Sequence, residues 1–73
     1  MNKRELIAQI ASQTGSTRDE DEEHLEAFGE IVTKTLKKGE DVHIPGFGKF
    51  HVREREGRKV PAFHAGRNLR ESI

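Results

Sequence analysis

The sequence predicts an α+β fold, in which two helices precede a three-stranded antiparallel sheet and a short C-terminal helix. Apolar residues recur at helical spacing over residues 1–39. Over residues 41–55 apolar and polar residues alternate instead, which is the period of strands with one buried face. Turn-forming pairs at residues 45–46 and 56–57 then separate the expected strands from one another.

The first helix is expected over Lys3–Thr14. Asn2 is a favourable N-cap, and Glu5 three residues later completes a capping box. Apolar residues at positions 6, 7, 10 and 11 form one stripe of this helix. Gly15 follows it and suits the left-handed conformation that ends many helices.

The second helix is expected to continue to Lys38 and Gly39, and Thr17 with Glu20 repeats the capping-box pattern at its start. Carboxylates at residues 19–23 lie near the positive end of the helix dipole, so we interpret them as a solvated helix end. DNA would avoid this acidic end, and the helix is therefore a poor reader of the major groove. Its apolar stripe contains Leu25, Phe28, Val32 and Leu36.

Two strands with opposite faces follow the helices. Val42 and Ile44 are the apolar positions of a short first strand. In the second strand, side chains on one face are apolar or absent, at Gly48, Phe50 and Val52. The other face is basic, with Lys49, His51, Arg53 and Arg55. A row of cations on the solvent side of a sheet indicates a polyanionic partner such as a nucleic-acid backbone.

A third, short strand is expected at Val60–Phe63, after a two-residue turn at Glu56-Gly57. Pro61 donates no hydrogen bond to a ladder, so this strand lies at an edge of the sheet or contains a bulge. Gly66 precedes a last helix over residues 67–73, in which Leu69 and Ile73 form an i, i+4 apolar pair.

The composition indicates a single small domain, residues 1–73, of which only 32% are hydrophobic and none is Cys. Within it we expect a helical hairpin at 1–39, a sheet at 40–64 and a helix at 65–73. So small a core usually requires oligomerisation or a ligand, and we expect a dimer. The sequence contains neither a membrane-spanning apolar run nor a signal peptide, which favours a cytoplasmic protein.

The charges cancel overall but are unevenly distributed. Thirteen Lys or Arg residues balance thirteen Asp or Glu residues. Residues 1–52 contain seven basic and ten acidic residues, whereas residues 53–73 contain six basic and three acidic ones. The C-terminal part is thus the basic part of the chain.

No arrangement of residues indicates catalysis, a cofactor or a metal site, and we predict a protein that is not an enzyme. The histidines show no paired ligand spacing, which favours isolated surface residues, although two of them would add positive charge near DNA at low pH. These two are His51 and His64, and the other histidines are His24 and His43. The four Phe residues are an alternative as stacking platforms for single-stranded bases, but their apolar surroundings favour core packing.

Five segments together carry a family resemblance: MNK.ELI at the start, LKKG at 36–39, GFGKF at 46–50, VRER at 52–55 and KVPAF at 59–63. In this order they resemble the HU/IHF family of bacterial histone-like DNA-binding proteins. The resemblance implies an intertwined homodimer or heterodimer whose two sheets form a saddle over DNA. In that family long β-arms enter the minor groove and wedge a proline between base pairs, which bends the duplex.

The sequence departs from the family where the arm belongs. Only EGRK separates Arg55 from Val60, in place of a much longer segment with a GRNP.TGE-like tip. The intercalating proline is absent with the arm. The second helix also departs, because the family has small or apolar residues at the positions of Asp21 and His24 and an aromatic at that of Gly29.

The resemblance also assigns functional residues. The positions expected to contact DNA are Lys3, Gly46, Arg53, Arg55, Arg58, Lys59, His64, Arg67 and Arg70. The expected dimer core contains Leu25, Phe28, Val32, Leu36, Phe47, Phe50 and Phe63. For Gly46 the alternative is that the turn itself requires a glycine.

Two functions remain open from the sequence. The first is an HU-like, nucleoid-associated protein that binds double-stranded DNA through its phosphates, with little sequence preference and with weakened binding and bending. The second is a dimerisation module that pairs with full-length relatives and has lost DNA binding. The arginines of the C-terminal part favour the first function, and the zero net charge favours the second.

Overall fold

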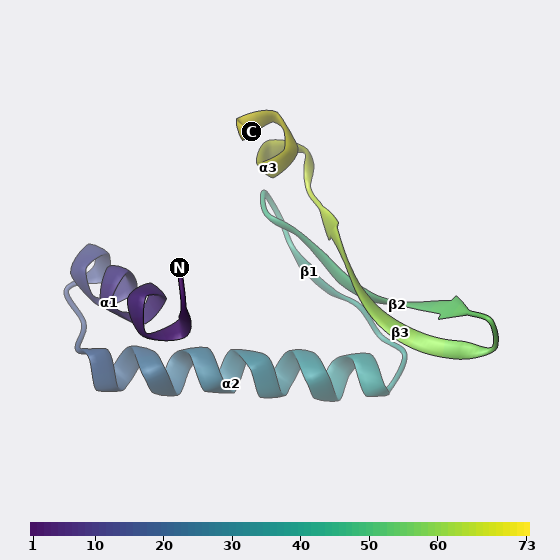
Figure 1. Cartoon of the computed structure of the whole chain (residues 1–73), viewed down its shortest axis with the longest axis horizontal. Coiled ribbons are helices and arrows are strands. Elements are labelled where there is room, and N and C mark those ends of the chain that lie inside the picture. The colour runs from purple at the N-terminus through teal and green to yellow at the C-terminus, as the bar shows by residue number, and fades with distance from the viewer. The chain divides into compact units, whose positions relative to one another are not determined.

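The computed structural model describes all residues, 1–73, as two parts, residues 1–31 and residues 32–73, which we describe separately. The elements are α1 (Lys3–Thr14), α2 (Arg18–Lys37), β1 (Val42–Ile44), β2 (Gly48–Arg55), β3 (Arg58–Ala65) and α3 (Arg67–Ser72) (Figure 1). The strands form one antiparallel sheet in the order β1-β2-β3. The predicted α+β class and the predicted order of elements are confirmed.

Helix α1 begins and ends at the predicted residues because both of its ends are capped. The Asn2 side chain accepts a hydrogen bond from the Glu5 backbone N–H at 2.8 Å, and the Glu5 carboxylate accepts one from the Asn2 N–H at 3.2 Å. At the other end Gly15 has a φ of 80°, and its N–H donates to the carbonyl of Ala11 at 2.9 Å. These bonds satisfy backbone groups that a helix end otherwise leaves unpaired.

Helix α2 begins with the second predicted capping box. The Thr17 hydroxyl accepts a hydrogen bond from the Glu20 N–H at 3.1 Å, and the Glu20 carboxylate accepts one from the Thr17 N–H at 2.9 Å. The helix ends at Lys37, slightly earlier than predicted. Gly39 lies in a turn, because its N–H donates to the carbonyl of Leu36 at 2.9 Å instead of extending the helical bonding.

Asp21 corrects the interpretation of residues 19–23 as a fully solvated acidic run. The residue is only 4% exposed, and its carboxylate accepts a hydrogen bond from the hydroxyl of Ser16. The imidazole Nδ1 of His24 lies 3.5 Å from its other carboxylate oxygen. A carboxylate withdrawn from water needs such partners, since desolvation disfavours its charge. The other carboxylates of the run are exposed, as predicted, at Asp19, Glu20, Glu22 and Glu23.

The predicted two-residue turn at Glu56-Gly57 is confirmed. Arg55 and Arg58 are the last paired residues of β2 and β3. Both turn residues have a positive φ, 52° at Glu56 and 76° at Gly57, as in the hairpin turns that match the twist of paired strands. Gly57 adopts this conformation without the steric penalty that a side chain brings.

Strand β3 spans eight residues and is longer than the strand predicted at residues 60–63. Its pairing with β2 continues from Arg58 to Ala65, which lies opposite Gly48. Pro61 lies on this strand, which has a neighbour on one side only. Of the two predicted alternatives, an edge strand or a bulge, the structure shows the edge strand, which tolerates the missing N–H of proline.

One face of the sheet is apolar and contains a cluster of three aromatic rings. Phe50 and Phe63 are paired across β2 and β3, and their ring centroids lie 4.9 Å apart. The ring of Phe47 lies 5.2 Å from that of Phe63. A Cβ atom at Gly48 would lie 2.4 Å from the Phe63 ring, which is too close for two carbon atoms. Glycine is therefore required at this position of β2, where the ring packs against the backbone.

Helix α3 begins after Gly66 and ends at Ser72. Ile73 lies beyond the helix and is fully exposed, so the predicted helical pair of Leu69 and Ile73 is wrong. Nothing packs against this last residue, and an end without packing contacts is poorly held in a helix. None of the three helices has the length and hydropathy of a membrane span.

The chain by itself buries very little apolar surface. Ile7, at 7% exposed, is its one buried hydrophobic residue. The residues expected to form a dimer core are half-buried at Leu25, Val32, Leu36 and Phe50, and exposed at Phe28, Phe47 and Phe63. The core of the single chain is therefore small even for a chain of this size.

Candidate nucleic-acid interface

The pairing of β2 with β3 brings three arginines together on one face of the hairpin. Arg55 lies directly opposite Arg58, and Arg53 points to the same face because side chains alternate along a strand. All three side chains are exposed. We call Arg53, Arg55 and Arg58 the arginine cluster, and the face on which they lie the polar face.

The arginine cluster has no negative charge beside it on the polar face. None of the three arginines forms an ion pair. Like charges placed directly opposite each other across two strands repel, so the pair Arg55–Arg58 destabilises the hairpin unless an anion lies between them. Guanidinium groups bind phosphate through two parallel hydrogen bonds, which makes this cluster suited to a phosphate backbone.

Lys59 lies on the opposite, apolar face of the sheet. It is paired with Glu54, and both residues are one position away from those of the arginine cluster. A shift of one residue along a strand moves a side chain to the other face. The structure therefore separates Lys59 from the arginines with which the sequence grouped it.

Two of the predicted DNA-contacting cations form ion pairs within the chain. Lys3 Nζ lies 3.2 Å from the carboxylate of Glu26 and 3.8 Å from that of Glu22. Arg67 Nε lies 3.1 Å from the carboxylate of Glu71. These pairs are solvent-exposed and contribute only about 0–1 kcal/mol each, so they do not prevent either cation from contacting a phosphate.

Of three other predicted DNA-contacting positions, two are exposed and the third is a glycine required by a turn. His64 is exposed on the polar face, and Arg70 is exposed on α3. Gly46 has a φ of 84° in the turn between β1 and β2, so the backbone conformation of the turn explains the glycine.

The register adds residues to the polar face that the sequence did not assign to the site. Lys49 of β2 is paired with His43 on one side and with His64 on the other. The alternating pattern of β2 had placed Lys49 and His51 on the basic face, but it carries no information about which residues of β1 and β3 lie beside them. Only the pairing of all three strands shows that His43, Lys49 and His64 lie side by side.

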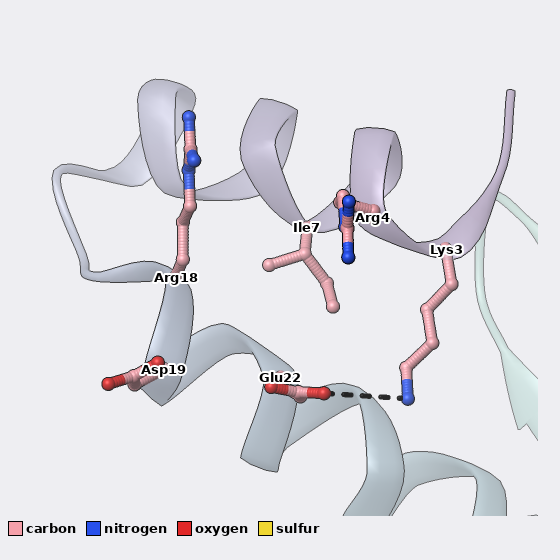
Figure 2. Close-up of a pocket in the computed structure, with 6 residues that line it drawn as sticks. All are labelled: Lys3, Arg4, Ile7, Arg18, Asp19 and Glu22. Atoms are coloured by element: carbon pink, nitrogen blue, oxygen red, sulfur yellow. Dashed lines mark ion pairs between the residues drawn. The ribbon is translucent and has the colours of Figure 1, made fainter.

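A pocket lies between α1 and the N-terminal part of α2, and the sequence did not predict it. Figure 2 shows Ile7 between the two helices, with cationic and anionic side chains around it. The other lining residues are Lys3, Arg4, Arg18, Asp19 and Glu22. Because both signs of charge line this pocket, it has no preference for an anion.

Comparisons with known proteins match nearly the whole chain. A family model described as bacterial DNA-binding protein matches residues 1–67. The chain is similar to DNA-binding protein HU of Lactococcus lactis subsp. lactis (strain IL1403), with 43% identity over 88 positions that cover 99% of this chain and 97% of the relative. It is also similar to the SPbeta prophage-derived DNA-binding protein HU 2 of Bacillus subtilis (strain 168), with 48% identity over 89 positions that cover 100% of this chain and 97% of the relative.

Solved structures give the same result. HU from Thermotoga maritima has a TM-score of 0.87 and 39% identity, covering 99% of this chain and 97% of that chain. The protein chain of an Anabaena HU-DNA cocrystal structure has a TM-score of 0.92 and 33% identity, covering 99% and 96%.

The relatives are longer than this chain. The alignments span 88 and 89 positions against 73 residues, which leaves at least 15 positions of each relative without a counterpart. In this chain β2 and β3 are joined by two residues, so no arm extends from the hairpin. With this difference in length, the match over residues 1–67 and the identity to HU proteins over the whole chain show that this chain belongs to the bacterial DNA-binding protein family that includes HU.

Proposed function

We propose that this chain is an architectural DNA-binding protein of the bacterial nucleoid that contacts duplex DNA through its phosphates. The observation that carries the proposal is the arginine cluster, in which three exposed guanidinium groups share one face of a hairpin without an ion pair. The HU names of the relatives and the HU-DNA cocrystal structure support the same function. It is the function of a binding protein and requires no catalytic group.

The proposed contacts predict little sequence preference. Arginine contacts to phosphate fix the position of a protein on DNA but carry no direct information about the bases. Most of the binding free energy then comes from released counterions, so the affinity falls as salt rises. Without an arm each protomer offers few such contacts, and we expect weak binding with a shallow dependence on salt.

The missing arm also predicts little bending of DNA. Proteins that kink DNA from the minor groove insert an apolar side chain between base pairs. The hairpin of this chain ends in Glu56-Gly57, and neither residue can act as such a wedge. Strong acceleration of ring closure of a short duplex by this protein would contradict this part of the proposal.

We further expect the protein to bind DNA as a dimer. Phe47 and Phe63 are 44% and 41% exposed, and Ile7 is the one hydrophobic residue that the chain buries. Exposed aromatic rings on the apolar face of a small sheet indicate a surface that a partner covers, and in this family a second copy or a relative fits that role.

The test is fluorescence anisotropy of a labelled duplex of about 20 base pairs, titrated at several salt concentrations. Replacing Arg53, Arg55 and Arg58 with Ala should weaken binding by about tenfold or more and reduce the salt slope by about 0.9 for each phosphate that the variant no longer neutralises. The control replaces Lys34, Lys37 and Lys38 with Ala, which removes the same charge from exposed positions outside the sheet.

The two variants separate a defined interface from a general charge effect. Equal losses of affinity in both would show that net charge, and not the arginine cluster, determines binding. Unchanged binding of the arginine variant would overturn the proposed interface. Circular dichroism of each variant checks that the fold is retained.

A further inference from the structure

The polar face contains a row of imidazoles beside the arginine cluster. His43 of β1, Lys49 of β2 and His64 of β3 are direct cross-strand neighbours. His51 lies two positions after Lys49 on β2 and therefore points to the same face. His43 and His64 are exposed, and His51 is half-buried. We call His43, His51 and His64 the histidine row.

Almost all charges around this row are positive. Besides Lys49, strand β2 contributes Arg53 and Arg55 to the same face, and β3 contributes Arg58. The one carboxylate within ion-pairing distance is Asp41, which precedes β1 and lies 3.8 Å from Lys49. Helix α3, which follows β3, contains Arg67 and Arg70 with one carboxylate, Glu71. An anion that binds the arginine cluster therefore meets further donors along the same face.

The histidine row does not form a metal site. The structure contains no group of three or more His, Cys, Asp or Glu side chains that could hold a metal ion. His43 and His64 are separated by the whole width of β2, since Lys49 lies between them. Imidazoles bind protons, and they ordinarily change charge between about pH 5 and 8.

We propose that the histidine row extends the DNA-binding surface in a proton-dependent manner, so that each protonated imidazole contacts a phosphate beside those held by the arginine cluster. This inference rests on the proposed function, because it assigns the same ligand, a phosphodiester backbone, to the same face. A nearby phosphate favours the protonated form of an imidazole, and binding therefore takes up protons. DNA affinity rises as the pH falls through the range in which the row becomes charged.

The experiment measures duplex binding at about pH 6 and about pH 8 at one ionic strength, for the wild type and for a variant with His43→Gln, His51→Gln and His64→Gln. The wild type should bind several-fold more tightly at the lower pH, with a salt slope that increases by about 0.9 for each imidazole that contacts a phosphate. The Gln variant should lose the difference in affinity between the two pH values.

Two further variants sharpen the test. His24→Gln is the matched control, because His24 lies on α2 outside the sheet, and this variant should retain the full pH dependence. Replacing the histidine row with Lys makes its charge permanent, so binding at the higher pH should reach the wild-type affinity at the lower pH. Calorimetry in buffers of different ionisation enthalpy should detect proton uptake on binding by the wild type and none by the Gln variant.

The outcomes distinguish this inference from the proposed function. Salt-dependent wild-type binding that is equal at both pH values, or full pH dependence in the Gln variant, would overturn the role of the histidine row and leave the arginine interface intact. If the wild type binds no DNA at low salt at either pH, the proposed function and this inference are both wrong.

Discussion

Asp21 shows how a single side chain of α2 departs from the pattern around it. It lies in a run of five carboxylates, and the position suggests a solvated helix end. The hydroxyl of Ser16, in the loop before α2, donates to it, and that hydroxyl is in turn 2.6 Å from the hydroxyl of Thr14. The carboxylate thus joins the end of α1 to the start of α2, and it is the one carboxylate of the run that is withdrawn from water.

Removal of this carboxylate should destabilise the fold. We expect Asp21→Ala to lower the free energy of unfolding by about 1–3 kcal/mol, because the part-buried Ser16 hydroxyl loses its acceptor. Glu23→Ala, at an exposed position of the same run, should change stability by no more than about 0.5 kcal/mol. Urea unfolding of both variants provides the comparison, and equal stabilities would show that Asp21 has no structural role.

Glu20 makes the start of α2 sensitive to acid. Hydrogen bonds from the Thr17 backbone N–H, and then from the Thr17 side chain, lower the pKa of Glu20 below its ordinary value of 4.5. A lowered pKa in the folded state means that the stabilisation is complete above the ordinary value and is lost as the pH falls through the folded value.

This pH dependence can be measured at the carboxyl group itself. NMR titration of the Glu20 side-chain carbon should give a midpoint below 4.5 in the wild type. In Thr17→Ala, which removes the hydroxyl but keeps the N–H, the midpoint should rise part of the way toward the ordinary value. A midpoint that is the same in both proteins would contradict the contribution of the hydroxyl to this capping box.

At the scale of elements, the β2–β3 hairpin determines which charges act together. Residues of this hairpin alternate between the arginine cluster on one face and the Glu54–Lys59 pair on the other. The turn at its end contains Glu56, the one non-glycine residue with a positive φ, and a carboxylate close in sequence to Arg55 and Arg58. Glu56 therefore affects both the stability of the hairpin and the electrostatic potential around its arginines.

We expect Glu56→Asn to improve both properties. Asn tolerates the left-handed conformation better than Glu, and Asn-Gly is a favoured pair for this turn, so stability should rise by a few tenths to about 1 kcal/mol. Loss of the carboxylate should also tighten DNA binding. Glu54→Gln is the charge-matched control on the apolar face. Thermal unfolding compares the stability of the two variants, and fluorescence anisotropy compares their DNA binding. If Glu54→Gln tightens DNA binding as much as Glu56→Asn does, DNA does not distinguish the two faces.

At the scale of the whole molecule, the small core predicts that folding and association are coupled. One chain buries a single hydrophobic residue, Ile7, and leaves about two-fifths of the surface of Phe47 and Phe63 exposed. A dimer whose chains are not stable alone has an unfolding temperature that rises with protein concentration. Sedimentation should show a dimer, and thermal unfolding should shift upward across a concentration series. A monomer with a constant unfolding temperature would contradict the proposed dimer.

The sequence by itself determined the local features of this protein. The two capping boxes, the glycine that ends α1 and the turn at Glu56-Gly57 were all predicted from residues a few positions apart. Such features depend on backbone conformation and on hydrogen bonds between near neighbours, which a short stretch of sequence encodes. The motifs around these features also led to the correct family.

The tertiary structure decided which of these residues act together. The register separated Lys59 from the arginine cluster and placed His43 and His64 beside Lys49. The fold also placed Asp21 out of water, where its carboxylate accepts a hydrogen bond from Ser16. His43, Lys49 and His64 come from three different strands, and a one-residue change of register reverses every face, so the alternation within one strand does not determine which of these side chains become neighbours.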